Sequence, residues 1–185
     1  MRVGVLALQG DFREHAALLV GMGHETVLIR KAEELSDLDA LIIPGGESTT
    51  IGKLADRYGL LEPLREVIAG GLPTLGTCAG LIFLAAGTTG NSQIHLGVLD
   101  VVVERNAFGR QIDSFEAELA VSGLDGPLHA VFIRAPVVAK VGAEVEVLAA
   151  VGDDPVMVRQ GNIVATSFHP ELTGETRVHE LMLEN

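Results

Sequence analysis

Cys78 lies in the pentapeptide Gly-Thr-Cys-Ala-Gly at residues 76–80, which has the form of a nucleophile elbow. Small residues on both sides let a strand turn sharply into a helix, so that the nucleophile projects from the corner. A thiol there faces the positive end of the helix dipole, which favours the thiolate, and neighbouring backbone N–H groups can bind an oxyanion. A lone cysteine is more commonly a buried hydrophobic residue, but the flanking glycines favour a nucleophile here.

A base for this thiol is offered by the segment Ser-Phe-His-Pro-Glu at residues 167–171. In an extended segment, residues two apart face the same side, and Pro170 stiffens the backbone between His169 and Glu171. Glu171 can then orient the imidazole of His169, as the third member of a triad does. A His-x-Glu pair taken alone is more typical of a solvated loop, and it gains weight from the cysteine elbow. We therefore predict that Cys78, His169 and Glu171 are catalytic.

A second glycine-rich turn, Pro-Gly-Gly-Glu-Ser at residues 44–48, follows another expected strand. Its N–H groups could complete an oxyanion hole opposite Cys78, although a plain tight turn explains the same residues. Arg105 and Arg134 are among the few cations of an acidic chain. Either guanidinium can bind a substrate carboxylate, and surface salt bridges are the alternative.

The remaining histidines lack a comparable setting, and we expect them at surface or packing positions: His15, His24, His95, His129 and His179. No cysteine and histidine cluster has the spacing of a zinc site. No Walker-type or dinucleotide-binding glycine pattern occurs either. We therefore assign no metal ligands.

Alternating strands and helices are predicted for the first half of the chain, in the order that repeated βαβ units require. The expected strands are residues 3–8, 26–29, 39–43 and 73–77. The expected helices are residues 12–20, a helix after the 44–48 turn with Ser48 as its N-cap, 62–69 and 79–86. Asp11 and Glu14 have capping-box spacing at the first helix, whose apolar face should comprise Phe12, Ala16, Leu19 and Val20.

Short β-rich runs replace this pattern after Leu96, at residues 98–103, 115–121, 130–133, 145–151, 156–160 and 163–166. We expect them to extend the sheet with antiparallel strands, and a last helix over residues 175–183 to close the chain. No linker, repeat or low-complexity tract interrupts the sequence. These patterns predict a single α/β domain over residues 1–185, with a mixed, mostly parallel central sheet flanked by helices.

The composition agrees with one globular domain in a reducing compartment. Of the 185 residues, 48% are hydrophobic but only 4% aromatic, so Val, Leu, Ile and Ala must build the core. A net charge of -12 repels phosphate backbones and anionic lipid, which argues against nucleic-acid and membrane binding. The single cysteine cannot form an internal disulfide, and residues 3–8 are too short for a secretory signal. We therefore expect a cytoplasmic protein.

The motifs in their order resemble those of class I, or triad-type, glutamine amidotransferases. Four longer segments are similar to one family among them, the glutaminase subunits of pyridoxal 5'-phosphate synthase. These segments are Leu-Ala-Leu-Gln-Gly at 6–10, Arg-Asn-Ala-Phe-Gly-Arg-Gln at 105–111, Phe-Ile-Arg-Ala-Pro at 132–136 and Ser-Phe-His-Pro-Glu-Leu at 167–172. The resemblance spans the chain from the first strand to the last helix, with no departure at a motif position. It implies a flavodoxin-like, class I amidotransferase fold.

The resemblance also implies a role for each matching residue. Cys78 would be the nucleophile, with His169 and Glu171 completing the triad. The implied glutamine site comprises Gly46, Glu47, Ser48, Arg105, Ile133 and Arg134, and the implied oxyanion donors come from Gly45, Gly46 and Ala79.

The family further implies hydrolysis of L-glutamine to L-glutamate and ammonia without a cofactor. The ammonia would pass to a separate barrel-shaped synthase subunit for vitamin B6 biosynthesis, in an assembly of 12 glutaminase and 12 synthase chains. Members of the family are typically poor glutaminases until the synthase docks. Two alternatives stay open: a glutaminase for another acceptor, such as imidazole glycerol phosphate or a purine precursor, and a non-catalytic regulatory or stress-type protein that shares the elbow.

Overall fold

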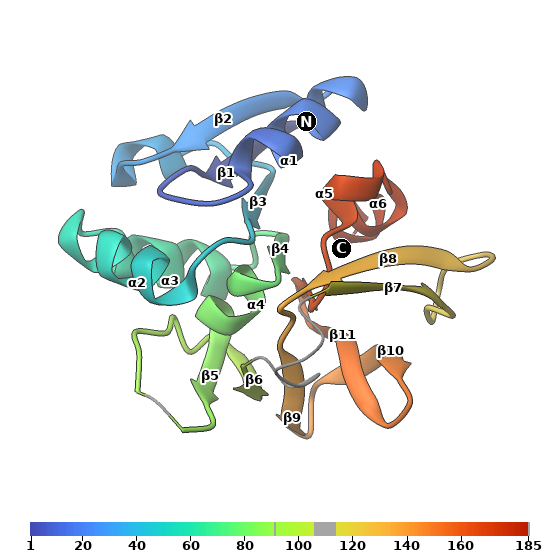
Figure 1. Ribbon diagram of the computed structural model, residues 1–185. Helices are drawn as coiled ribbons and strands as arrows, with labels where there is room; N and C mark the ends of the chain where they lie inside the picture. Colours follow the sequence, from blue (N-terminus) through green and yellow to red (C-terminus); the bar gives the residue numbers. More distant parts are fainter. Residues whose placement is uncertain (91, 106–113, 185) are drawn as a thin grey trace.

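A seven-stranded sheet forms the centre of the computed structural model, which describes residues 1–90, 92–105 and 114–184 (Figure 1). Its strands from β12 to β2 are parallel, whereas β10, β11 and β12 pair in antiparallel fashion. In spatial order the strands are β10 (Glu146–Val151), β11 (Asp154–Gln160), β12 (Ile163–Thr166), β4 (Thr74–Thr77), β3 (Ala40–Ile43), β1 (Arg2–Leu6) and β2 (Glu25–Ile29). The predicted mixed, mostly parallel sheet is confirmed.

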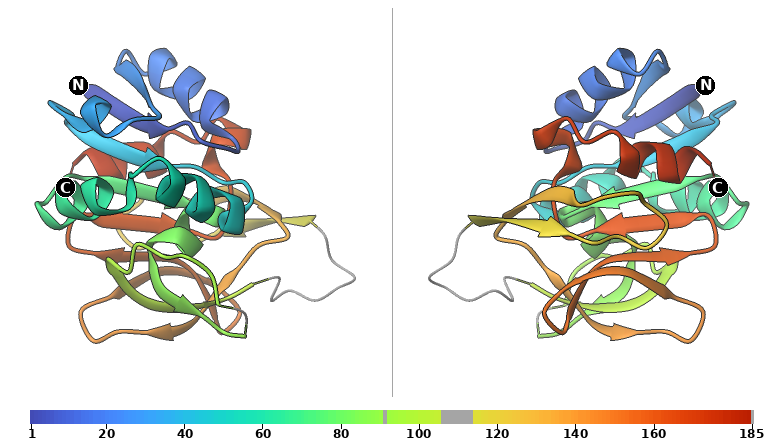
Figure 2. Two further views of the ribbon diagram at one scale, coloured as in Figure 1. Left: turned by 90° about the vertical axis from the view of Figure 1, so that its left-hand side faces the viewer. Right: turned by 90° about the vertical axis from the view of Figure 1, so that its right-hand side faces the viewer.

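Helices cover both faces of this sheet, because the buried strands carry apolar side chains on both sides. In β3, Leu41 and Ile43 belong to one core cluster, whereas Ala40 and Ile42 belong to the other. The first cluster includes residues of α2 (Ser48–Arg57), α3 (Leu61–Ala69), α4 (Ala79–Leu84) and the short helix η1 (Ala32–Leu35). The second cluster includes residues of α1 (Phe12–Gly21) and α6 (Arg177–Leu183), and α5 (Pro170–Thr173) contacts α1 (Figure 2). Within the described part of the chain, no helix combines the length and the apolar character needed to cross a membrane.

Several of the later strands form two small sheets of their own. β5 (Ala85–Thr88), β6 (Leu99–Glu104) and β9 (Val137–Val141) form a three-stranded sheet, and β7 (Ser114–Leu119) pairs with β8 (Leu128–Ile133). The prediction that residues 98–103, 115–121 and 130–133 extend the central sheet is therefore wrong. Strands β10, β11 and β12 do extend the central sheet; β12 is antiparallel to β11, as predicted, but parallel to β4. Sequence periodicity identifies strands, but the pairing partner depends on tertiary packing.

Helix boundaries and caps also differ from prediction in places. The helix expected over residues 79–86 ends at Leu84, because the chain continues as β5, and the closing helix is preceded by the separate turn of α5. Asp11 makes no side-chain cap hydrogen bond to α1. Ser48 is the first residue of α2, and the cap before it is Glu47.

The Glu47 carboxylate closes the N-terminus of α2 by accepting hydrogen bonds from backbone N–H groups of Thr49 and Thr50, at 3.0 and 2.8 Å. Burial raises the pKa of Glu47, but these hydrogen bonds and that of the Thr50 hydroxyl outweigh burial and lower the pKa to about 2. Glu47 therefore stays negative at neutral pH, and it replaces the predicted serine cap.

The corner at Cys78 depends on a close approach between α4 and β3. Cys78 has φ 49° and ψ -102°, a conformation that costs energy for a residue with a side chain. A Cβ on Gly80 would lie 2.0 Å from the carbonyl oxygen of Ile43, and a Cβ on Gly76 would lie 2.4 Å from a methyl carbon of Leu84. The small residues of the elbow thus let the chain turn sharply into α4, as the sequence predicts, and they also let α4 pack directly against the end of β3.

We expect Gly80→Ala to lower the free energy of unfolding by about 1–3 kcal/mol, the usual cost of overpacking a core, because its methyl group would collide with the Ile43 carbonyl. Gly21→Ala is the matched control, since a Cβ there meets nothing within 4 Å. Urea unfolding followed by circular dichroism measures both variants. Equal stability of Gly80→Ala and wild type would show that the corner tolerates a side chain.

Candidate active site

A cavity of about 380 Å³ opens beyond the carboxyl ends of β1, β3, β4 and β12. Ligand sites of open α/β sheets occur at this edge, where loops from neighbouring strands converge. The residues that line the cavity are Gln9, Asp11, Gly46, Glu47, Ser48, Cys78, Ala79, Ile82, Arg105, Ile133, Arg134, His169 and Leu172.

All six residues implied for the glutamine site therefore lie around one cavity, together with Cys78, Ala79 and His169. Glu171 lies behind His169 and does not line it, and neither does Gly45. The structure thus brings the predicted residues together, whereas their individual roles stay predictions.

His169 joins the cavity to a buried carboxylate. Its Nδ1 lies 2.7 Å from Oε1 of Glu171, and both side chains are almost completely buried. Because a carboxylate only accepts, Nδ1 carries the proton of this hydrogen bond, and Nε2 is left for the thiol. The side chain of His169 also forms a hydrogen bond with Cys78. The order of contacts is that of a nucleophile, a base and an orienting acid.

The electrostatic setting of His169 favours its protonated form. Burial lowers the pKa of His169, but the hydrogen bonds and negative charges of Cys78 and Glu171 outweigh burial and raise the pKa to about 10. Burial raises the pKa of Glu171, and the contact with His169 offsets part of that change. A protonated imidazole beside the sulfur is the form that stabilises a thiolate nucleophile.

The backbone around the predicted oxyanion donors is tightly packed. Gly46 has φ 146°, in the region that favours glycine, and a Cβ there would lie 2.4 Å from Oε1 of Gln9. The same Gln9 oxygen accepts the backbone N–H of Glu47 at 2.7 Å. A Cβ on Gly45 would lie 2.5 Å from Cε1 of His169, so this turn packs directly against that imidazole.

The two arginines approach the cavity from different elements. Arg105 forms an ion pair with Glu47 at 3.5 Å, and its Nη1 lies 3.1 Å from Oε1 of Gln93. Arg134 follows β8 with φ 44°, a strained conformation for a residue with a side chain. Arg105 is thus both a surface salt-bridge residue and part of the cavity wall. Residues 106–111 of its motif lie outside the described residues.

Sequence reasoning missed several residues of this site. Gln9, Ile82 and Leu172 line the cavity without having been assigned a role, and so does Asp11. Oδ2 of Asp11, predicted only as a helix cap, lies 3.5 Å from Nδ1 of His169. Gln9 lies within the Leu-Ala-Leu-Gln-Gly segment, Asp11 lies two residues after Gln9, and Leu172 directly follows Glu171. Only these positions could have drawn attention to them, and Ile82 carries no such signal.

Asp11, His169 and Glu171 also offer ligand atoms that lie within 4.8 Å of one another, the spacing of a possible metal site. Nδ1 of His169, however, already binds Glu171, while the same ring contacts Cys78. We therefore interpret the group as a base with its acidic partners.

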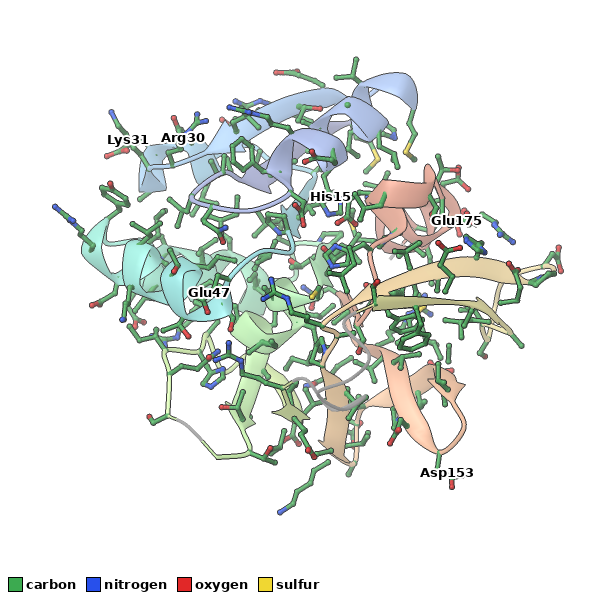
Figure 3. The ribbon with its side chains drawn as sticks, viewed as in Figure 1. His15, Arg30, Lys31, Glu47, Asp153 and Glu175 are labelled. Atoms are coloured by element: carbon green, nitrogen blue, oxygen red, sulfur yellow. The ribbon has the colours of Figure 1, made fainter. Side chains whose placement is uncertain are left out.

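Two other histidines lie deep in the core, next to Glu171. His15 and His179 are fully buried, and Nδ1 of His15 lies 2.9 Å from Nε2 of His179. Nε2 of His15 lies 3.1 Å from Oγ1 of Thr77 and 3.3 Å from Oε2 of Glu171. Figure 3 shows His15 projecting from α1 toward the helices at the end of the chain.

The predicted apolar face of α1 explains why His15 was overlooked. The buried residues of α1 are His15 and Leu19, four residues apart, whereas Val20 is 63% exposed. The prediction that Val20 belongs to the buried face is wrong. Because His15 is polar, a buried face defined by apolar residues alone does not include it. His95 and His129 hold peripheral positions: His95 contacts the Ile82 carbonyl, and His129 pairs with glutamates on the hairpin surface.

The fold and the comparisons with known proteins define a glutamine amidotransferase. A solved structure described as a glutamine amidotransferase aligns with 98% of this chain and 97% of its own, with a TM-score of 0.94 and 58% identity. A model of the SNO glutamine amidotransferase family matches residues 5–185. The chain belongs to this SNO family.

Its relatives include two proteins named pyridoxal 5'-phosphate synthase subunit PdxT. The protein from Parafrankia sp. is 60% identical over 99% of this chain and 92% of its own length. The protein from Thermus thermophilus is 60% identical over 98% of this chain and 96% of its own length. The PurLQS structure from Thermotoga maritima, at 18% identity and a TM-score of 0.72, shares the fold.

The raised pKa of His169 predicts a pH-dependent contribution to stability. In the folded protein His169 has a pKa of about 10, whereas a histidine in the unfolded chain has a pKa of about 6.5. The stabilisation is therefore complete below about pH 6.5 and is lost as the pH rises toward 10. We expect the difference in free energy of unfolding between wild type and His169→Asn to shrink steadily across this range.

Urea unfolding at successive pH values measures this difference, with His24→Asn as a histidine control outside the cavity. A difference between wild type and His169→Asn that stays constant, or grows, from pH 6.5 to 10 would contradict the charged imidazole.

Proposed function

We propose that this chain is the glutaminase subunit of a pyridoxal 5'-phosphate synthase, and that Cys78, His169 and Glu171 are its catalytic triad. The observation that carries the proposal is the placement of Cys78 and His169 on one cavity, with Glu171 bound to the far side of the imidazole. Membership of the SNO glutamine amidotransferase family supports glutamine as the substrate. Full-length relatives named as synthase subunits support the partner.

The reaction begins when the Cys78 thiolate attacks the side-chain carboxamide of glutamine. The carbonyl oxygen becomes an oxyanion, which backbone N–H groups of Ala79 and the Gly45-Gly46 turn stabilise. Protonated His169 gives its proton to the departing nitrogen, and ammonia leaves as the thioester forms. Water, deprotonated by the now neutral His169, then attacks the thioester and releases glutamate and the thiolate. Glu171 holds the imidazole in the same orientation for both steps.

Glutamine is held by its charged end at the other side of the cavity. Arg105 and Arg134 offer guanidinium groups for its carboxylate, and Ile133 lines the same cavity with its carbonyl oxygen 4.0 Å from Sγ of Cys78. Glu47, which is negative at neutral pH, offers a partner for the ammonium group. Gly46 and Ser48 complete this glutamine site at the start of α2. The reaction uses no cofactor, since the thiol and imidazole supply its covalent and proton-transfer chemistry.

Ammonia passes directly to the synthase subunit, where it is used to make pyridoxal 5'-phosphate, and the complex works in the cytoplasm. A reducing compartment suits this chemistry because Cys78 must remain a free thiol. The resemblance of the whole chain to its family supports an assembly of 12 glutaminase and 12 synthase chains.

Variants of the triad test the assignment. We expect Cys78→Ala to abolish ammonia release, even with the synthase present, while binding to the synthase survives. His169→Asn should also abolish turnover, and Glu171→Gln should reduce it less, because an orienting group contributes less than the base. A coupled glutamate assay with and without the synthase measures all three, with the surface variant His129→Asn as control. Turnover by Cys78→Ala would remove the proposed nucleophile.

The assembly can be tested separately. Native mass spectrometry or light scattering of the chain mixed with its synthase should give the mass of 12 chains of each kind. When either protein is omitted, the mass of the mixed complex should be absent. A stable complex of any other composition would refute this stoichiometry without affecting the triad.

A further inference from the structure

We propose that His15 is a positioning residue for the reaction, which holds the second carboxylate oxygen of Glu171 so that the first stays on His169. This inference rests on the proposed function of Glu171. It extends the triad inward by one residue, from the cavity to the centre of the domain.

The contacts form a continuous chain of polar groups. Oε1 of Glu171 lies 2.7 Å from His169, and Oε2 of the same carboxylate lies 3.3 Å from Nε2 of His15. On its other side, Nδ1 of His15 lies 2.9 Å from Nε2 of His179, and Oγ1 of Thr77 lies 3.1 Å from Nε2 of His15, the same atom that faces Glu171. These partners come from α1, α6 and β4, so three separate elements determine the position of one carboxylate.

Oε2 of Glu171 needs such a donor. It is buried, and within residues 1–90, 92–105 and 114–184 it makes no well-aligned hydrogen bond. A buried carboxylate oxygen without a donor loses its hydration with little compensation. The Nε2 atom of His15 lies 3.3 Å from this oxygen, within reach of a hydrogen bond.

The charge of Glu171 selects the proton arrangement of the two imidazoles. With a proton on Nε2, His15 donates toward Glu171, and its Nδ1 accepts the Nε2 proton of His179. The opposite arrangement would point a lone pair at the negative carboxylate. The backbone carbonyl of Glu175 favours this opposite arrangement, but Nδ1 of His179 has no well-aligned hydrogen bond to it. The carboxylate of Glu171 therefore favours the arrangement in which Nε2 of His15 carries the proton.

A neutral imidazole suits this position better than a cation. Burial, reinforced by His179 and His169, lowers the pKa of His15 well below its usual value. His15 thus donates a hydrogen bond without a positive charge, and the negative charge of Glu171 remains available to His169. Thr77, the residue before the nucleophile, ties this network to the corner at Cys78.

A matched pair of amide variants tests the inference. In His15→Gln the side-chain nitrogen can reach the place of Nε2, whereas in His15→Asn it reaches only the place of Nδ1. With the synthase present, we expect His15→Asn to lower kcat for glutamine about tenfold with KM changed less than about twofold, since Glu171 acts on chemistry and not on binding. His15→Gln should retain most of the wild-type kcat.

A double-mutant cycle separates positioning from structural damage. In the Glu171→Gln background, His15→Asn should lower kcat by less than about twofold, because the carboxylate on which His15 acts is gone. The same tenfold loss in both backgrounds would overturn the inference. So would a change in KM alone, or a well-folded His15→Gln that is as slow as His15→Asn.

Thermal unfolding would reveal whether His15→Asn misfolds. If it does, a variant of a neighbouring residue tests the same network. His179→Leu removes the donor that fixes His15, and it should lower kcat in the wild-type background but not with Glu171→Gln. Equal losses in the two backgrounds would again overturn the inference. If Cys78→Ala turns over glutamine, the proposed function fails; if it is inactive but the cycles are additive, only the role of His15 fails.

Discussion

The hydrogen bond between His169 and Glu171 is the contact on which the site depends. It fixes which imidazole nitrogen carries the bound proton, and it leaves the other nitrogen for Cys78. Both partners are almost completely buried, so water competes little for this bond. Burial alone would oppose charge on the imidazole, and the negative groups on either side reverse that effect. Because β4 and β12 are parallel neighbours, they end side by side, and this brings Cys78 and His169 to the same edge of the sheet.

Much of the architecture could be predicted because its signals are local. The elbow glycines, the alternation of apolar runs and the ordered motifs identified the α/β fold and the amidotransferase family, and both predictions are confirmed. The same locality explains the errors. Strands β6, β7 and β8 were recognised as strands, but their separation from the central sheet depends on partners far away in the sequence. Ser48 was a reasonable cap from composition, yet the longer Glu47 side chain reaches the same N–H groups.

The interior of the site was harder to predict than its surface. Cys78 and the His-Pro-Glu segment carry recognisable spacing, and the structure places them around one cavity, although their roles stay predictions. His15 carries no such signal, since it is a polar residue in an ordinary helix. It lies 156 positions before Glu171 in the chain. Its proximity to Glu171 becomes apparent only in the folded structure, in which α1 packs against the end of the chain. Position in three dimensions, not residue type, distinguishes it from His24 or His129.

The contact between Gly80 and the carbonyl of Ile43 has a consequence for correlated motion. Ile43 is the last residue of β3, and the turn with Gly45 and Gly46 begins directly after it. The helix that follows Cys78 and the turn with Gly45 and Gly46 therefore share one anchor point. Because protein interiors are close-packed, a shift at the end of β3 would carry the start of α4 and this turn with it. A site assembled from two loops thereby gains the geometric constancy of a single rigid element.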